Sequence, residues 1–201
     1  MIDGVIKYSI NHTSDVSPTF KEYETLEALR LRLFTLGLIG VQDGIGYGNI
    51  SLRDKTTNSF FITATQTGNL TNLSSQHYTN ISSYDFVKFS VTSQGKHQPS
   101  SEALSHAMIY EIDSNINAVI HIHSKALWQL MKKDNSLYTE AEYGTANMVT
   151  EIASLYEDKN PFDDNIFVMK GHEDGIMAFG KSIKDAELKL YAKIQEYLSI
   201  V

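Results

Sequence analysis

The sequence predicts one α/β domain built on a mixed or antiparallel sheet that is covered by helices. Helical and strand-like apolar patterns alternate along the 201 residues, and 42% of the residues are apolar, which is enough for one core. Several strand-like segments are joined by links too short for the crossover that parallel strands require. No linker rich in proline, glycine or serine divides the chain. We therefore expect residues 1–201 to form a single domain, in which residues 1–17 are a loosely ordered or edge segment.

The first half of the chain predicts one helix and three strands. Proline fits the first turn of a helix, so Ser17-Pro18 is expected to begin a helix whose leucines recur at helical spacing until Gly37 ends it. The Thr-, Ser- and Asn-rich residues 64–75 are expected to form a loop that leads to a short turn. The predicted strands are 49–53, 59–63 and 84–91, the first two joined by a polar hairpin turn.

The second half of the chain predicts four helices and three further strands. Apolar residues at helical spacing predict the helices, and short β-rich runs predict the strands. The helices are expected at 101–112, 124–132, 145–156 and 183–198, and the strands at 118–123, 167–170 and 176–179.

Composition excludes several classes of function. The chain has no cysteine, so disulfides, thiolate metal sites and cysteine nucleophiles are excluded, and any metal must be bound by imidazole and oxygen. A net charge of −7 with three arginines argues against nucleic-acid binding. No apolar run approaches the ~20 residues of a membrane helix, and no secretory signal is visible, so we expect a cytoplasmic protein without a membrane partner.

Two histidines interrupt the apolar strand predicted at 118–123. Side chains alternate along a strand, so His121 and His123 lie on the same face as Val119, about 7 Å apart by the rise per residue. Two imidazoles at that separation can bind one cation. The alternative is a chance pair, or two hydrogen-bonded histidines at a strand end. Their position before Ser124, a good helix N-cap, favours a site, because functional residues gather at strand-to-helix junctions.

A catalytic zinc site usually has three protein ligands and one open position. Among the remaining histidines, His172 lies in a glycine-bounded polar turn, KGHEDG, between two predicted strands, where it can face a cleft. The alternative for His172 is an ordinary surface turn. Three other histidines lie in polar or loop-like segments and are weaker candidates for a metal ligand. They are His12, His77 and His97.

A carboxylate and two hydroxyls mark the start of the helix predicted at 101–112. Ser100 or Ser101 can cap this helix, and Glu102 can be an acidic residue in the first turn that interacts favourably with the positive end of the helix dipole. Alternatively, the backbone N–H groups and hydroxyls here bind an anion such as phosphate, and Glu102 moves a proton beside a metal. Spacing alone favours capping. His106 and Tyr110 follow on the face of Glu102 and are expected to pack behind it.

Together these segments resemble the class II aldolase/adducin-head family over about residues 25–198, with motifs most similar to those of L-fuculose-phosphate aldolase-like proteins. The matching motifs are Gly48-Asn49-Ile50-Ser51, Ser100-Ser101-Glu102 with His106 and Tyr110, Ala118–Ser124, a histidine–glycine turn at 172–175, Ile176–Gly180 and Lys184-Asp185-Ala186. The resemblance implies a three-layer α/β/α domain with a central, mostly antiparallel sheet. It also implies a homotetramer with sites between subunits.

The resemblance also implies roles for residues of this chain. It implies that His121, His123 and His172 bind a divalent metal, usually zinc, and that Glu102 is the catalytic acid/base. The residues implied or nominated to bind a substrate phosphate are Asn49, Thr67, Gly68, Ser100 and Ser101.

The sequence departs from the family pattern in two places. The family has its metal-binding histidine directly before the glycine, whereas Glu173-Asp174 separates His172 from Gly175, so Asp174 is an alternative third ligand. The loop that ends at Gly68 is longer than the family's Thr-Pro-x-Gly form, which puts the phosphate site in doubt. A neighbouring subunit often supplies a tyrosine in this family, for which the two candidates are Tyr138 and Tyr143.

The function that follows is a metal-dependent lyase. It would cleave an aldol bond in a sugar phosphate or a related small hydroxy-carbonyl compound through a metal-stabilised enediolate, in carbohydrate metabolism. The alternatives are a sugar-phosphate epimerase or dehydratase on the same fold, or a non-catalytic adducin-like interaction domain. A scaffold does not need the metal ligands and Glu102 together, so their joint presence favours an enzyme.

Overall fold

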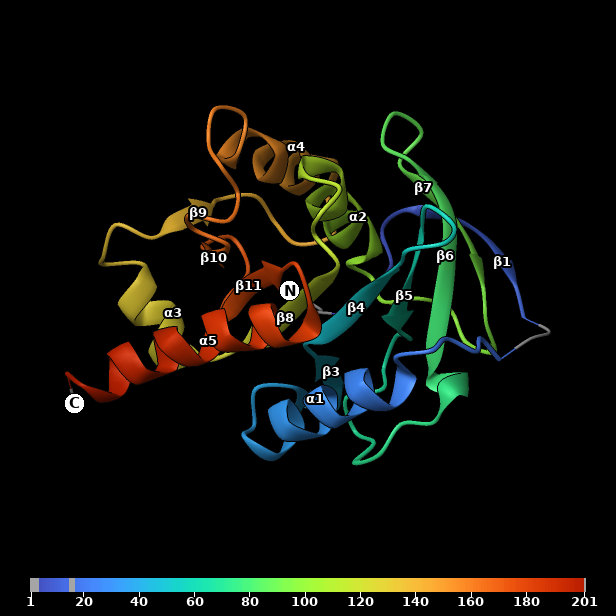
Figure 1. Cartoon of the computed structure of the whole chain (residues 1–201), viewed down its shortest axis with the longest axis horizontal. Coiled ribbons are helices and arrows are strands. Elements are labelled where there is room, and N and C mark those ends of the chain that lie inside the picture. Colours follow the sequence, from blue (N-terminus) through green and yellow to red (C-terminus); the bar gives the residue numbers. More distant parts are fainter. Residues whose placement is uncertain (1–3, 15–16, 201) are drawn as a thin grey trace.

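The computed structural model describes residues 4–14 and 17–200, and most of its strands form one nine-stranded sheet (Figure 1). From edge to edge, the strand order is β1-β7-β6-β5-β4-β8-β11-β10-β9. Neighbouring strands are antiparallel except for the pairs β1–β7 and β9–β10, so the sheet is mostly antiparallel, as predicted. The strands are β1 (Ser9–Thr13), β4 (Asn49–Asp54), β5 (Ser59–Thr63), β6 (Tyr78–Asp85), β7 (Ser90–Gln94), β8 (Ala118–His123), β9 (Leu137–Thr139), β10 (Ile166–Met169) and β11 (Gly175–Gly180).

Helices cover both faces of this sheet and produce the three predicted layers (Figure 1). Alternation along β8 separates two cores: Val119 packs with α2 and α4, whereas Ile120 and Ile122 pack with α1, α3 and α5. Each such buried aliphatic side chain contributes roughly 1.5–3 kcal/mol. The helices are α1 (Tyr23–Thr35), α2 (Ala103–Ile112), α3 (Lys125–Met131), α4 (Ala146–Leu155) and α5 (Ile183–Leu198).

The first helix begins later than the sequence predicts. It starts at Tyr23, whereas Ser17-Pro18 was the expected start. The reason is an aromatic contact: Phe20 stacks on Phe61 with ring centroids 4.3 Å apart and also packs edge-on against Tyr23. This contact fixes Phe20 against β5, and residues 17–22 lie outside the helix.

The strand predicted at 84–91 is wrong, because a turn at residues 86–89 divides it between β6 and β7. The side chain of Asp85 accepts a hydrogen bond from the Lys88 backbone at 2.9 Å, and Phe89 has a φ of +49°. The turn contains none of the glycine, proline or asparagine that usually marks one. Its aromatic residues are typical of strands, so the sequence pattern concealed it.

Several short elements were not predicted. β2 (Gly40–Gln42) and β3 (Ile45–Tyr47) form a separate hairpin in the glycine-rich segment. Strand β9 was also missed. By contrast, the 3₁₀ turn at Ser75–His77 is the short turn expected after the loop at 64–75. Within the segment 1–17, β1 lies at one edge of the sheet, and residues 1–3 and 15–16 lie outside the described residues. The other predicted helices and strands agree with the structure within two residues.

In the described ranges, no helix is both long and apolar enough to cross a membrane.

Candidate metal centre and active site

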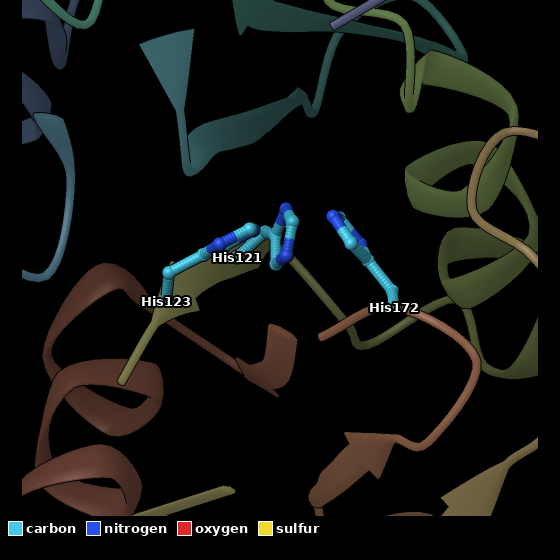
Figure 2. A group of neighbouring side chains, drawn as sticks. All are labelled: His121, His123 and His172. Carbon is cyan, nitrogen blue, oxygen red and sulfur yellow. The ribbon is translucent and has the colours of Figure 1, made fainter. Parts of the chain in front are cut away.

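Three imidazole rings converge on the face of the sheet that carries α2 and α4 (Figure 2). His121 and His123 come from β8, and His172 comes from the turn between β10 and β11. One ligand nitrogen from each ring lies within 4.8 Å of the others, and the ring centroids are 4.7–5.1 Å apart. This is the spacing of three donors around one cation.

The local fold explains why His172 reaches the strand histidines. Gly175 pairs with His123 in the register of β8 and β11, and the Gly175 N–H donates to the His172 carbonyl at 3.0 Å. A Cβ atom on Gly175 would lie 3.2 Å from the His172 ring, so only glycine leaves the turn this close. Asp174 adopts a φ of +66°, and its carbonyl accepts the Ser124 N–H at 2.9 Å. The turn is thus fixed to the end of β8.

The alternative ligand Asp174 lies outside this group. Within the described part of the chain, the imidazole and carboxylate ligand atoms that converge are those of the three histidines. Burial and the neighbouring Glu173 raise the pKa of the Asp174 carboxyl. The structure therefore brings His172, not Asp174, to the two strand histidines.

Glu102 lies directly beside the cluster, at the N-terminal end of α2. Its Oε2 contacts His121 Nδ1 and accepts a 2.8 Å hydrogen bond from Asn49 Nδ2, and its Oε1 lies 3.6 Å from His172 Nδ1. The residue is only 3% exposed. Burial raises the pKa of the Glu102 carboxyl, but His121 and His172 lower it more, so the pKa lies well below its usual value. Spacing favours Ser100 or Ser101 as the cap, and Ser100 Oγ accepts the Glu102 N–H at 3.3 Å. Glu102 itself is the N-cap residue, and its side chain makes no capping hydrogen bond.

The residues fit a divalent cation. His121 Nε2 and Glu102 Oε1 are buried and have no hydrogen-bond partner among the described residues. Buried polar atoms normally have a partner, and a ligated ion would satisfy such atoms. Three neutral imidazoles with one nearby carboxylate suit zinc and similar metals.

The residues expected to bind phosphate surround a second, narrow space beside Glu102. Asn49, Ser100, Ser101, Thr67 and Gly68 all line it, so the structure brings the five together. Its volume is about 30 Å³. That is room for about two water molecules, since one needs roughly 10–15 Å³.

A much wider cleft opens on the other side of the histidines. It has a volume of about 1080 Å³ and is lined by His123, His172 and Tyr143, among others. Tyr143 is buried, with its ring 4.8 Å from that of His172, whereas Tyr138 is 45% exposed with Lys170 over its ring. Of the two candidate tyrosines, Tyr143 of the same chain is therefore the one beside the cluster.

Comparison with known proteins shows the family. A family model described as the class II aldolase and adducin N-terminal domain matches residues 35–194. The chain belongs to this family. A search of curated proteins gave no match.

Solved structures of the class II aldolase fold resemble this chain along most of its length. An L-fuculose 1-phosphate aldolase is 19% identical, with a TM-score of 0.68 over 92% of this chain and 86% of its own. A sugar-phosphate aldolase from Thermotoga maritima is 16% identical, with a TM-score of 0.63 over 86% and 90%. The N-terminal class II aldolase domain of a Thermoplasma acidophilum protein is 16% identical, with a TM-score of 0.61 over 94% and 98%. At these identities the likeness shows the fold.

Some residues at this candidate site were not found from the sequence. Tyr47 stacks on His123 with centroids 5.2 Å apart, and Tyr8 donates to the Ser100 carbonyl at 2.7 Å. Gln66 lines the narrow space, and Gly4 lies against its side chain. Two of these residues had a signal in the sequence: Tyr47 stands next to the Gly48-Asn49 motif, and Gln66 lies in the loop that is longer than the family form. Tyr8 and Gly4 had none, because long-range contacts alone bring them here.

A buried polar network lies behind the site. Ser51 Oγ is 2.7 Å from both His106 Nδ1 and Tyr110 Oη, which confirms the prediction that these two residues pack behind Glu102. Burial lowers the pKa of His106 to about 3, while Glu102 opposes this change. His106 is therefore a neutral hydrogen-bonding residue at ordinary pH.

Proposed function

We propose that this chain is a metal-dependent lyase that cleaves an aldol carbon–carbon bond in a small hydroxy-carbonyl compound. The observation that carries the proposal is the convergence of three imidazoles beside the buried Glu102 carboxylate, at the end of a 1080 Å³ cleft. Zinc and a homotetrameric assembly are parts of this proposal that follow from the family resemblance.

His121, His123 and His172 would hold the cation. A divalent ion bound there would act as a Lewis acid that stabilises the negative charge developing on the substrate's carbonyl and hydroxyl oxygens. His123 and His172 also line the wide cleft, so a substrate in that cleft reaches the cation from the open side.

Glu102 would move the proton. In cleavage, the hydroxyl group on the carbon that becomes the new carbonyl would lose its proton to Glu102 as the carbon–carbon bond breaks. The electron pair of that bond passes to the carbon next to the original carbonyl, and Glu102 then gives the proton to that carbon. In synthesis, Glu102 removes the same proton. The 2.8 Å hydrogen bond from Asn49 fixes Oε2, which leaves Oε1 as the oxygen to which that proton transfers. A positioned acid/base of this kind contributes typically ~10²–10⁴-fold to rate.

The buried carboxylate also separates an enzyme from an adducin-like interaction domain. Burying an ionised carboxylate is costly, and Glu102 is stabilised here by His121, His172 and Asn49. An interaction domain has no use for a buried carboxylate among imidazoles, whereas a metal-dependent acid/base uses one.

The test is a screen of the zinc-loaded protein against small hydroxy-ketones and hydroxy-aldehydes, phosphorylated and not, with product analysis by NMR. Release of two carbonyl fragments, abolished by a chelator and restored by zinc, is the expected result. Recovery of an isomer with an intact carbon skeleton would replace the lyase with an epimerase, and loss of water would replace it with a dehydratase. Turnover that survives complete metal removal would contradict the proposal.

A further inference from the structure

We infer that Gln66 occupies the subsite in which a substrate phosphate was expected, and that the substrate is therefore unphosphorylated. The conclusion about the substrate rests on the proposed function. The conclusion that Gln66 fills the phosphate subsite does not depend on that function. Four observations on the narrow space beside Glu102 carry the inference.

The first observation is the position of the Gln66 side chain. Its Oε1 accepts a hydrogen bond from the Gly46 backbone N–H at 3.1 Å, across the narrow space from the start of α2. A Cβ atom on Gly4 would overlap Gln66 Nε2, so the amino-terminal segment holds this amide from the other side. Gln66 has a φ of +58°, which a residue other than glycine adopts only when its surroundings require it.

The second observation is that four of the donors around the narrow space are already engaged. The Gly46 N–H binds Gln66, and the Glu102 N–H donates to Ser100 Oγ at 3.3 Å. The Thr67 hydroxyl donates to the Ala64 carbonyl at 3.0 Å, and the Asn49 amide donates to Glu102. A phosphate would therefore have to break contacts within the protein before forming its own.

The third observation is charge. No lysine or arginine lines the narrow space within the described ranges, and the Glu102 carboxylate forms part of its wall. Arg30 lies under the same loop, but its guanidinium donates to the carbonyls of Thr67 and Thr71. A phosphate monoester carries about −1.5 to −2 charges at neutral pH. A phosphate in this space would therefore depend on neutral hydrogen-bond donors alone, and Gln66 already occupies one of them, the Gly46 N–H.

The fourth observation is the contrast in space and charge with the wide cleft. The narrow space has a volume of about 30 Å³ and the wide cleft about 1080 Å³, so the body of a substrate lies in the latter. Two lysines, Lys125 and Lys170, line the wide cleft against three acids, and Lys170 already lies over the Tyr138 ring. The lysines and acids that line the wide cleft therefore give it no excess of positive charge for a phosphate group.

The experiment uses two probes that differ only by phosphate, dihydroxyacetone and dihydroxyacetone phosphate, on the zinc-loaded protein. Isothermal titration should give dissociation constants within about threefold of each other for the unchanged protein. Gln66→Gly should bind the phosphate ester at least about tenfold more tightly and leave dihydroxyacetone unchanged, because it frees the Gly46 N–H. Glycine accepts the positive φ, so this variant keeps the backbone. Gln129→Ala, an exposed glutamine on α3, is the matched control.

A second measurement follows the thermal midpoint of the whole chain in inorganic phosphate. Phosphate also raises the thermal midpoint as an excluded salt and can bind the metal, but both effects act equally on the unchanged protein and on Gln66→Gly. An additional, saturable rise of the midpoint in Gln66→Gly therefore reports phosphate binding in the narrow space. The inference is overturned if the unchanged protein prefers the phosphate ester about tenfold, or if Gln66→Gly gains no phosphate response. If dihydroxyacetone shows no metal-dependent binding at all, the proposed function fails, and the phosphate shift still decides the role of Gln66.

Discussion

The two faces of the sheet differ in chemistry, although the same strand supplies both. On β8, the residues that face α1, α3 and α5 are apolar and fully buried. On the opposite face, Val119 is followed by His121 and His123, which lie beside Glu102 from α2. Because side chains alternate along β8, the residues on one face contribute to the stability of the fold and those on the other face form the candidate site. Substitutions on the two faces should therefore have separable effects on stability and on activity.

The largest effect is expected at the site face, from Glu102→Gln. The amide keeps the shape of the side chain but cannot transfer the proton, so kcat should fall by ~10²–10⁴-fold. The zinc content, measured by atomic emission, should remain at the level of the unchanged protein. Turnover at the parent rate would disprove the acid/base role of Glu102.

On the apolar face, Ile120→Ala should cost stability only. Ile120 is 1% exposed, and such a truncation typically costs ~2–5 kcal/mol through lost burial and a residual cavity. Urea unfolding of the zinc-loaded protein should show this loss, and the zinc affinity of the folded protein should stay unchanged. Leu188→Ala on α5, which is 54% exposed, is the control and should change stability by less than about 0.5 kcal/mol. A loss of zinc affinity in Ile120→Ala would show that the two faces are coupled.

Asn49→Ala tests the hydrogen bond that orients Glu102. Because the Asn49 amide donates to Glu102 Oε2, its loss should lower kcat by roughly 10–100-fold, as for other residues that position a metal site. Steady-state kinetics at saturating substrate checks this, with exposed Asn72→Ala as control. Unchanged kcat in Asn49→Ala would mean that Glu102 is positioned by its other contacts.

The smallest effect concerns the buried network behind the site. The pKa of His106 falls from 6.5 to about 3 on folding, so the unfolded chain binds the proton more readily. The stability that depends on neutral His106 is thus complete above pH 6.5 and is lost as the pH falls toward 3, by up to ~1.4 kcal/mol per pH unit. His106→Gln should reduce this slope in urea unfolding between pH 6.5 and 4.5, while exposed His97→Gln should not. An identical slope in His106→Gln would contradict the burial of a neutral imidazole.

The sequence predicted the parts of the molecule that local patterns determine. The alternation at 118–123 gave the strand, its two faces and the shared side of His121 and His123. The start of α1 and the turn at 86–89 were wrong because distant contacts decide them: Phe20 packs on Phe61, and an aromatic turn carries no turn residue. Gln66 was missed for the same reason, since its role depends on a backbone angle and on Gly4, 62 positions away.

The measurement that tests the central claim most directly is zinc binding by equilibrium dialysis to four proteins. These are the unchanged chain, His121→Ala, His172→Ala and Asp174→Asn, the last of which tolerates the positive φ at this position. We predict about one zinc ion per chain in the unchanged protein and in Asp174→Asn, and a loss of affinity of about a hundredfold or more in each histidine variant. Full zinc content in both histidine variants at the same affinity would contradict the convergence of these imidazoles on one cation.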